Sequence, residues 1–144
     1  MVKPINKTEI SFPSNSVNEG FARAAVTAFL AQLDPTVADL TDLKTAVSEA
    51  VTNAIVHGYR DTIGIVYITV KIFADGKAVV RVRDRGCGIP DIKQAMEPLF
   101  TTGGEERAGL GFAVMQSFCD SLRVTSSEGR GTSVTLTKFF AKKE

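Results

Sequence analysis

The sequence has few residues of the kinds that hold metals or crosslink a fold. It contains two cysteines, Cys87 and Cys119, and a single histidine, His57. A structural zinc site uses about four Cys or His ligands, so no Cys/His zinc set can be assembled from this composition. We expect both thiols to be free, because we also expect the protein to occupy a reducing compartment.

Long apolar runs and an excess of one charge are also missing. The longest apolar runs fall far short of the roughly 20 residues that cross a bilayer, and residues 1–12 lack the apolar centre of a signal peptide. These absences predict a cytoplasmic protein. The net charge of +1 gives no electrostatic reason to expect direct nucleic-acid binding, which needs a concentrated basic face.

What remains is the composition of an ordinary globular domain, with 44% hydrophobic and 23% charged residues among 144. A chain of this length fits one domain, which we place at residues 1–144. We therefore expect one functional site on one scaffold.

Residue patterns predict a mixed order of strands and helices. The strands are expected at 8–12, 63–73, 78–82, 122–126 and 133–140, and the helices at 16–33, 35–58 and 112–120. Ser16-x-x-Glu19 has capping-box spacing, and Asp34-Pro35 is expected to end the first helix and to begin the second. Asp75-Gly76 predicts a hairpin turn.

The second predicted helix carries a continuous apolar stripe. Its apolar residues fall at i, i+3, i+4, i+7 and onward, namely Leu43, Ala46, Val47, Ala50, Val51, Ala54 and Ile55. The predicted fold class is α+β, a two-layer sandwich whose mixed, mostly antiparallel sheet has helices on one face.

A first chemical motif lies on the same helix. Glu49, Asn53 and His57 recur every four residues and therefore share one flank, at the margin of the apolar stripe. A carboxylate and a carboxamide thus look outward together. An isolated Glu-x-x-x-Asn most often only solvates a helix edge, so this pair does not identify a site by itself.

Two glycine-rich segments follow. In residues 84–88 (Asp-Arg-Gly-Cys-Gly), glycines allow a flat base to approach a tight bend, and Asp84 can accept a hydrogen bond from an exocyclic amine. Residues 101–104 (Thr-Thr-Gly-Gly) open a stretch expected to be flexible, which ends at 109–111 (Gly-Leu-Gly), where a helix begins and phosphates can bind. Arg107 lies in that stretch, where a guanidinium can close over a terminal phosphate. Each segment alone is also an ordinary turn or loop.

The three motifs, in this order, resemble the Bergerat-type ATP-binding fold of DNA gyrase, Hsp90-type chaperones, histidine kinases and mismatch-repair ATPases, over roughly residues 39–138. The resemblance implies that Asn53 ligates Mg²⁺, that Glu49 polarises the attacking group, and that the Thr132 hydroxyl supports Asp84. It implies an ATP lid between the second and third motifs. The remaining ATP contacts that it implies are Asp84, Gly86, Gly88, Thr101, Thr102, Arg107, Gly109, Leu110 and Gly111.

A narrower resemblance covers nearly the whole chain. Residues 48–59, 98–102, 21–23 and 31–35 look like the anti-sigma serine kinases of spore-forming bacteria. This implies a homodimer that binds a sporulation sigma factor, of the sigma F type, and uses Mg-ATP to phosphorylate a serine of an anti-anti-sigma protein. Arg23 is then a candidate partner contact. The lid sequence at 103–106 departs from the lysine- or proline-containing versions of this group, so the register of Arg107 is the least fixed.

Other functions of the same fold compete with the serine kinase. Neither a Walker A sequence nor the His-Arg-Asp set of ordinary protein kinases is present. A histidine kinase needs a phosphoacceptor histidine on a separate dimerisation helix, whereas His57 lies one turn past Asn53. An ATPase in which Glu49 activates water, and a binding module that uses ATP only to order its lid, stay open as alternatives.

Overall fold

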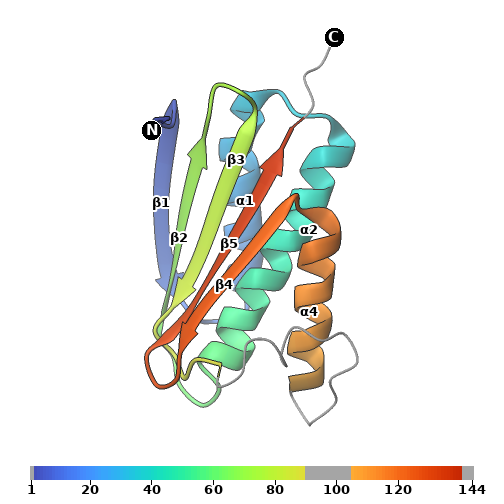
Figure 1. The fold of residues 1–144 in the computed structure, drawn as a ribbon. Coiled ribbons are helices and arrows are strands. Elements are labelled where there is room, and N and C mark those ends of the chain that lie inside the picture. The colour runs from blue at the N-terminus through green and yellow to red at the C-terminus, as the bar shows by residue number, and fades with distance from the viewer. Residues whose placement is uncertain (1, 90–104, 141–144) are drawn as a thin grey trace.

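The computed structural model describes residues 2–89 and 105–140, with the side chains of 105–110 excepted. Its elements follow one another along the chain as shown in Figure 1. They are β1 (Asn6–Pro13), α1 (Asn18–Leu30), η1 (Ala31–Leu33), α2 (Val37–Asn53), η2 (Ala54–Gly58), β2 (Ile65–Ile72), β3 (Lys77–Asp84), α4 (Glu105–Phe118), β4 (Ser121–Ser127) and β5 (Gly131–Phe139).

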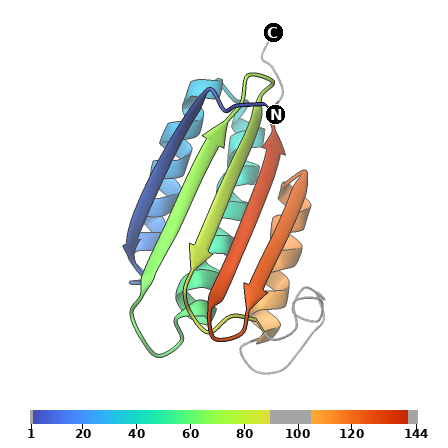
Figure 2. The ribbon, with the colours of Figure 1, turned by 60° about the vertical axis from the view of Figure 1, so that its left-hand side comes forward.

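The strands form one five-stranded sheet in the order β1-β2-β3-β5-β4. All four neighbouring pairs are antiparallel. Helices α1, α2 and α4 cover one face, and Figure 2 looks onto the other face, with the helices behind the sheet. The predicted α+β class is confirmed, and within the described residues the sheet is purely antiparallel.

The core lies between the sheet and the helices. Strands β2 and β3 alternate buried and more exposed residues, as expected when one face of an antiparallel sheet is packed. From the helix side, the predicted apolar stripe is buried throughout, and Leu43 and Val51 are fully inaccessible. The hydrophobic periodicity therefore predicted the core correctly.

The predicted helix starts are wrong in detail. Val17 occupies the N-cap of α1 and no side chain caps that end. The Glu19 carboxylate instead accepts a hydrogen bond from the Ser48 hydroxyl on α2, so a contact between helices replaces the expected capping box. At α2 the cap is Thr36, whose Oγ1 accepts the Asp39 N–H at 3.1 Å. Asp34 adopts a left-handed conformation, with φ 50°, in the turn before it.

Candidate functional site

Glu49 and Asn53 face helix α4 at the point where that helix carries Gly111. A Cβ atom placed on Gly111 would lie 3.1 Å from Asn53 Nδ2 and 3.2 Å from Glu49 Oε2. Within the described part of the chain, Asn53 Nδ2 is buried and has no hydrogen-bond partner. The structure thus brings the first motif and the end of the third motif together, with a polar group left unsatisfied between them.

Helix α2 changes its winding directly after Asn53. Residues of η2 form a π-helical turn, in which the Tyr59 N–H donates to the Ala54 carbonyl at 3.2 Å. Single π-helical turns are rare and occur often at functional sites. Gly58 ends this turn, as predicted, and lies against Asp84, whose Cγ would be 2.8 Å from a Cβ atom placed on Gly58.

Asp84 is the last residue of β3, and its carboxylate points inward with only 6% of the residue exposed. Oδ1 accepts the Gly86 N–H at 2.9 Å. Burial raises the pKa of Asp84 above its ordinary value, and backbone hydrogen bonds from Gly86 and Thr132 oppose that rise. A carboxylate has about four acceptor positions, so one that accepts these two N–H groups can also accept a hydrogen bond from an exocyclic amine.

The bend at residues 86–88 is held between η2 and the β4–β5 turn. The Cys87 N–H donates to the Gly58 carbonyl at 2.9 Å, and the Cys87 carbonyl accepts the Gly129 N–H at 2.7 Å. A Cβ atom on Gly86 would collide with the backbone carbonyl of Gly58, and Gly88 has a φ of 75°. Both glycines are therefore required by the close approach and the turn of the backbone.

Tyr59 is a positioning residue that the sequence patterns did not reveal. Its buried hydroxyl donates to the Ile65 carbonyl at 2.7 Å and accepts the Arg85 N–H at 2.7 Å. One side chain thus ties the end of η2 to the start of β2 and to the segment after Asp84. The hydroxyl bonds to residues that are brought to it by the fold, so no local sequence motif predicts these contacts.

Thr132 supports Asp84 in a different way from the one expected. The two residues are paired across β3 and β5, and the backbone N–H of Thr132 bonds to the carboxylate. The Thr132 hydroxyl shares a hydrogen bond of 2.9 Å with Ser126. Ser126 in turn accepts the Ile89 N–H at 2.7 Å. The expected hydroxyl support of Asp84 is thus supplied by the main chain.

The third motif begins its helix earlier than predicted. Helix α4 starts at Glu105, so Arg107, Gly109 and Leu110 lie within a helix and not in a loop before it. The glycines suggested a loop, but Gly111 serves a close approach to Asn53 and Glu49. Thr101 and Thr102 lie outside the described residues, and the side chains of Arg107 and Leu110 do too.

The Glu49 and Asn53 side chains fit a magnesium ion better than a transition metal. Carboxylate and carboxamide oxygens suit Mg²⁺, which usually takes one or two protein ligands and completes its shell with phosphates and water. In the described ranges, no group of three or more His, Cys, Asp or Glu side chains is placed to hold a metal. Both cysteines are free there, as predicted.

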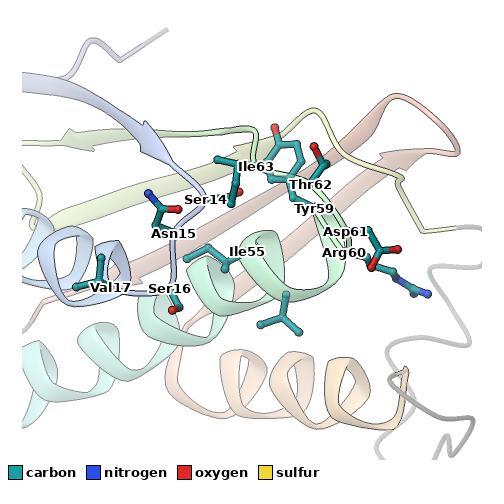
Figure 3. Close-up of a pocket in the computed structure, with 11 residues that line it drawn as sticks. Ser14, Asn15, Ser16, Val17, Ile55, Tyr59, Arg60, Asp61, Thr62 and Ile63 are labelled. Carbon is teal, nitrogen blue, oxygen red and sulfur yellow. The ribbon is translucent and has the colours of Figure 1, made fainter.

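A pocket of about 640 Å³ lies where the β1–α1 loop meets η2 and the loop after it. Figure 3 shows Ser14 beside Ile63, with Asn15, Ser16 and Val17 along the β1–α1 loop and Ile55 on the helix below them. Val17 and Ile63 are 79% and 62% exposed. The pocket adjoins α1, where the predicted partner contact, Arg23, pairs with Glu19 at 3.9 Å.

Similarity to known proteins agrees with this geometry. The sequence profile described as "Histidine kinase-like ATPase domain" matches residues 12–138. The chain is 57% identical over 136 residues to the anti-sigma F factor of Thermoanaerobacter sp. (strain X514), covering 93% of this chain and 94% of that one. It is 54% identical over 139 residues to the anti-sigma F factor of Geobacillus kaustophilus, covering 95% and 94%.

Solved structures show the same fold. The crystal structure of the RsbU and RsbW domains of Rv1364c from Mycobacterium tuberculosis superposes with a TM-score of 0.71 at 24% identity, over 95% of this chain and 32% of that one. A histidine kinase domain from Erythrobacter litoralis gives a TM-score of 0.56 at 20% identity, over 85% and 61%. Within the part of the chain that is described, no helix has the length and apolar character of a membrane span.

Proposed function

The chain belongs to the histidine kinase-like ATPase family and is similar over nearly its whole length to anti-sigma F factors, and from this premise we propose that it is a cytoplasmic anti-sigma factor with serine kinase activity. It binds a sporulation sigma factor and uses Mg-ATP to phosphorylate a serine of an anti-anti-sigma protein. The observation that carries the enzymatic part is the convergence of Glu49, Asn53 and Gly111, with a buried amide left without a partner.

The proposed nucleotide site runs from Asp84 to the N-terminal half of α4. Asp84 accepts the exocyclic amine of adenine, and the bend at Gly86 and Gly88 lets the base approach the backbone. The phosphates reach toward the first turn of α4, because the first N–H groups of a helix have no partner within it and lie at the positive end of the helix dipole. Because α4 starts at Glu105, we assign the phosphates to its first turn, which carries Arg107.

The chemistry falls to groups between α2 and α4. Glu49 orients the serine hydroxyl and accepts its proton, and Asn53 with the ATP phosphates would hold a magnesium ion, which supplies charge neutralisation when bound. Arg107 offsets charge on the transferred phosphoryl group. Positioning and charge stabilisation supply most of the rate enhancement in phosphoryl transfer, so a site with few reactive groups is sufficient.

The kinase activity is tested by incubating the purified protein with γ-labelled Mg-ATP and a candidate anti-anti-sigma protein. We expect label on a serine of the partner, loss of transfer in Asn53→Ala, and a larger effect of Glu49→Gln on the transfer rate than on ATP affinity. Glu9→Gln, at an exposed carboxylate of β1, is the matched control and should keep full activity.

Two outcomes would contradict this assignment. Wild-type transfer by Glu49→Gln would place the base elsewhere. ATP binding without transfer to any partner serine would favour a binding module that uses ATP only to order its lid.

We propose that partner proteins bind the surface of α1 around Arg23, in a homodimer. Arg23 is partly exposed on α1, where it pairs with Glu19, and the exposed Phe21 on the same helix and Val17 at its start supply apolar area. We expect Arg23→Glu to weaken binding of the sigma factor or the anti-anti-sigma protein, with ATP affinity unchanged. The matched charge reversal is Lys44→Glu, at an exposed position of α2. Equal affinities of both variants for both partners would remove Arg23 from the interface.

A further inference from the structure

The open face of the sheet concentrates positive charge that the overall composition hides. Positions that alternate with the buried residues of the strands point away from the helices. Lysine and arginine occupy many of these outward positions, which are Lys7, Lys71, Lys77, Arg81, Arg83 and Arg123. Among the outward strand residues, the one carboxylate is Glu9, which lies 3.5 Å from Lys7. We call this surface the basic face.

One end of the basic face is hollowed into a pocket of about 420 Å³. Strands β3, β5 and β4 and the β4–β5 turn contribute its lining, which includes Arg83, Arg85 and Arg130. Hydroxyl groups of Thr125 and Ser133 lie in the same lining. Guanidinium and hydroxyl donors that converge in a concave site are the groups that bind carboxylates and phosphates.

The buried Asp84 also lines the pocket, but among the described residues no ion pair joins it to the pocket arginines. In the part of the chain described, none of Arg83, Arg85 and Arg130 forms an ion pair. Arg83 Nε is buried and has no hydrogen-bond partner there. Neighbouring like charges repel, so an anion in this pocket relieves that repulsion.

We propose that the basic face is a docking surface for an acidic protein segment, with one carboxylate seated among Arg83, Arg85 and Arg130. Charge complementarity identifies the occupant as a polyanion, since a second copy of this chain would bring one basic face against another. Figure 2 shows that the helices leave this face uncovered.

The aromatic residues favour protein over nucleic acid as the polyanion. Proteins that bind single strands stack bases on open aromatic rings. Here the guanidiniums of Arg83 and Arg85 lie 5.0 Å from the Tyr67 ring centroid, and Lys77 lies 4.3 Å from that of Phe73. These cations already occupy faces of both rings, and the exposed ring of Phe139, which pairs with Lys77, lies at the end of the face away from the pocket. Carboxylates need only the guanidinium edges.

The test uses a fluorescein-labelled oligo-glutamate peptide, with oligo-glutamine as the neutral peptide control, in fluorescence anisotropy at low salt. We expect oligo-glutamate to bind, and Arg83→Gln/Arg130→Gln to weaken it about tenfold or more, the scale of a charge-assisted contact. The matched double variant Lys7→Gln/Lys71→Gln removes the same charge from the same face away from the pocket, and should weaken binding less than about threefold.

Three results would overturn the proposal. They are no binding of oligo-glutamate at low salt, equal losses in the two double variants, and tighter binding of a labelled oligonucleotide than of oligo-glutamate. Because Arg83 packs on Tyr67, the single variant Arg130→Gln, in an exposed turn, repeats the measurement without disturbing the sheet. Circular dichroism of every variant establishes that it is folded, and the measurement needs no ATP, so its failure leaves the kinase proposal standing.

Discussion

Replacing Asp84 with asparagine is expected to weaken ATP binding while removing a pH-dependent cost from the folded protein. The substitution keeps the shape of the side chain and one acceptor oxygen but removes the charge. A hydrogen bond to a charged group contributes about 1.5–3 kcal/mol and a neutral one about 1 kcal/mol. The difference is roughly 1.4 kcal/mol, so the Kd for ATP should rise about tenfold.

In the absence of nucleotide, the stability of the wild-type protein relative to Asp84→Asn should fall as pH rises. Burial raises the pKa of Asp84 above its ordinary value of 3.8, so the folded state holds this proton more tightly than the unfolded state does. Relative to Asp84→Asn, the wild-type protein is therefore most stable below pH 3.8, and it loses that advantage as pH rises through the raised folded pKa. At neutral pH the variant also loses one backbone hydrogen bond, worth about 1 kcal/mol, which partly offsets the relief.

Two measurements separate these effects. Isothermal titration with ATP at neutral pH gives the change in Kd, and urea unfolding of both proteins across the acidic range gives the difference in unfolding free energy at each pH. Glu9→Gln controls for loss of an exposed carboxylate. The reasoning is refuted if the wild-type protein gains stability over Asp84→Asn as pH rises, or if ATP affinity is unchanged.

Three further predictions follow from single residues. Gly111→Ala should weaken ATP binding in a titration, because its methyl would lie 3.1 Å from Asn53 Nδ2 and 3.2 Å from Glu49 Oε2 and would displace both side chains. Mass spectrometry after iodoacetamide treatment should find the exposed Cys87 alkylated, more slowly with ATP present, and Cys119 spared, since burial raises the pKa of Cys119 to about 11. Leu43→Ala should lower the unfolding free energy by about 2–5 kcal/mol in urea, because Leu43 is fully buried.

Features of the fold that repeat along the chain could be predicted from the sequence, whereas features set by one distant contact could not. The stripe on α2 and the alternation in β2 and β3 depend on many residues, so the core was predicted correctly. The start of α1 depends on which group hydrogen-bonds to the Glu19 carboxylate. That group is the Ser48 hydroxyl, 29 positions along the chain. Local spacing contains no information about that choice.

Some residues of the candidate site could likewise be predicted from the sequence, and others could not. Motif order was enough to select Glu49, Asn53 and Asp84, and the structure places all three around the end of α2 and the neighbouring end of β3. Tyr59 and the main-chain support of Asp84 by Thr132 could not be predicted, because both depend on strand register and on the π-helical turn. The same applies to Gly111 of α4, which approaches Asn53 and Glu49 of α2.

The charge distribution shows why composition alone describes the partners of this chain poorly. A net charge of +1 averages over surfaces that the sheet separates, since alternate residues of β3 point to opposite faces. Asp84 is therefore buried, while its neighbours Arg83 and Arg85 are more exposed in the pocket lining that all three share. If both proposals hold, an acidic segment seated there brings negative charge toward Asp84 and disfavours the carboxylate that accepts adenine. By linkage, bound ATP then weakens binding of the acidic segment by the same factor. Binding at one face of β3 therefore opposes binding at the other.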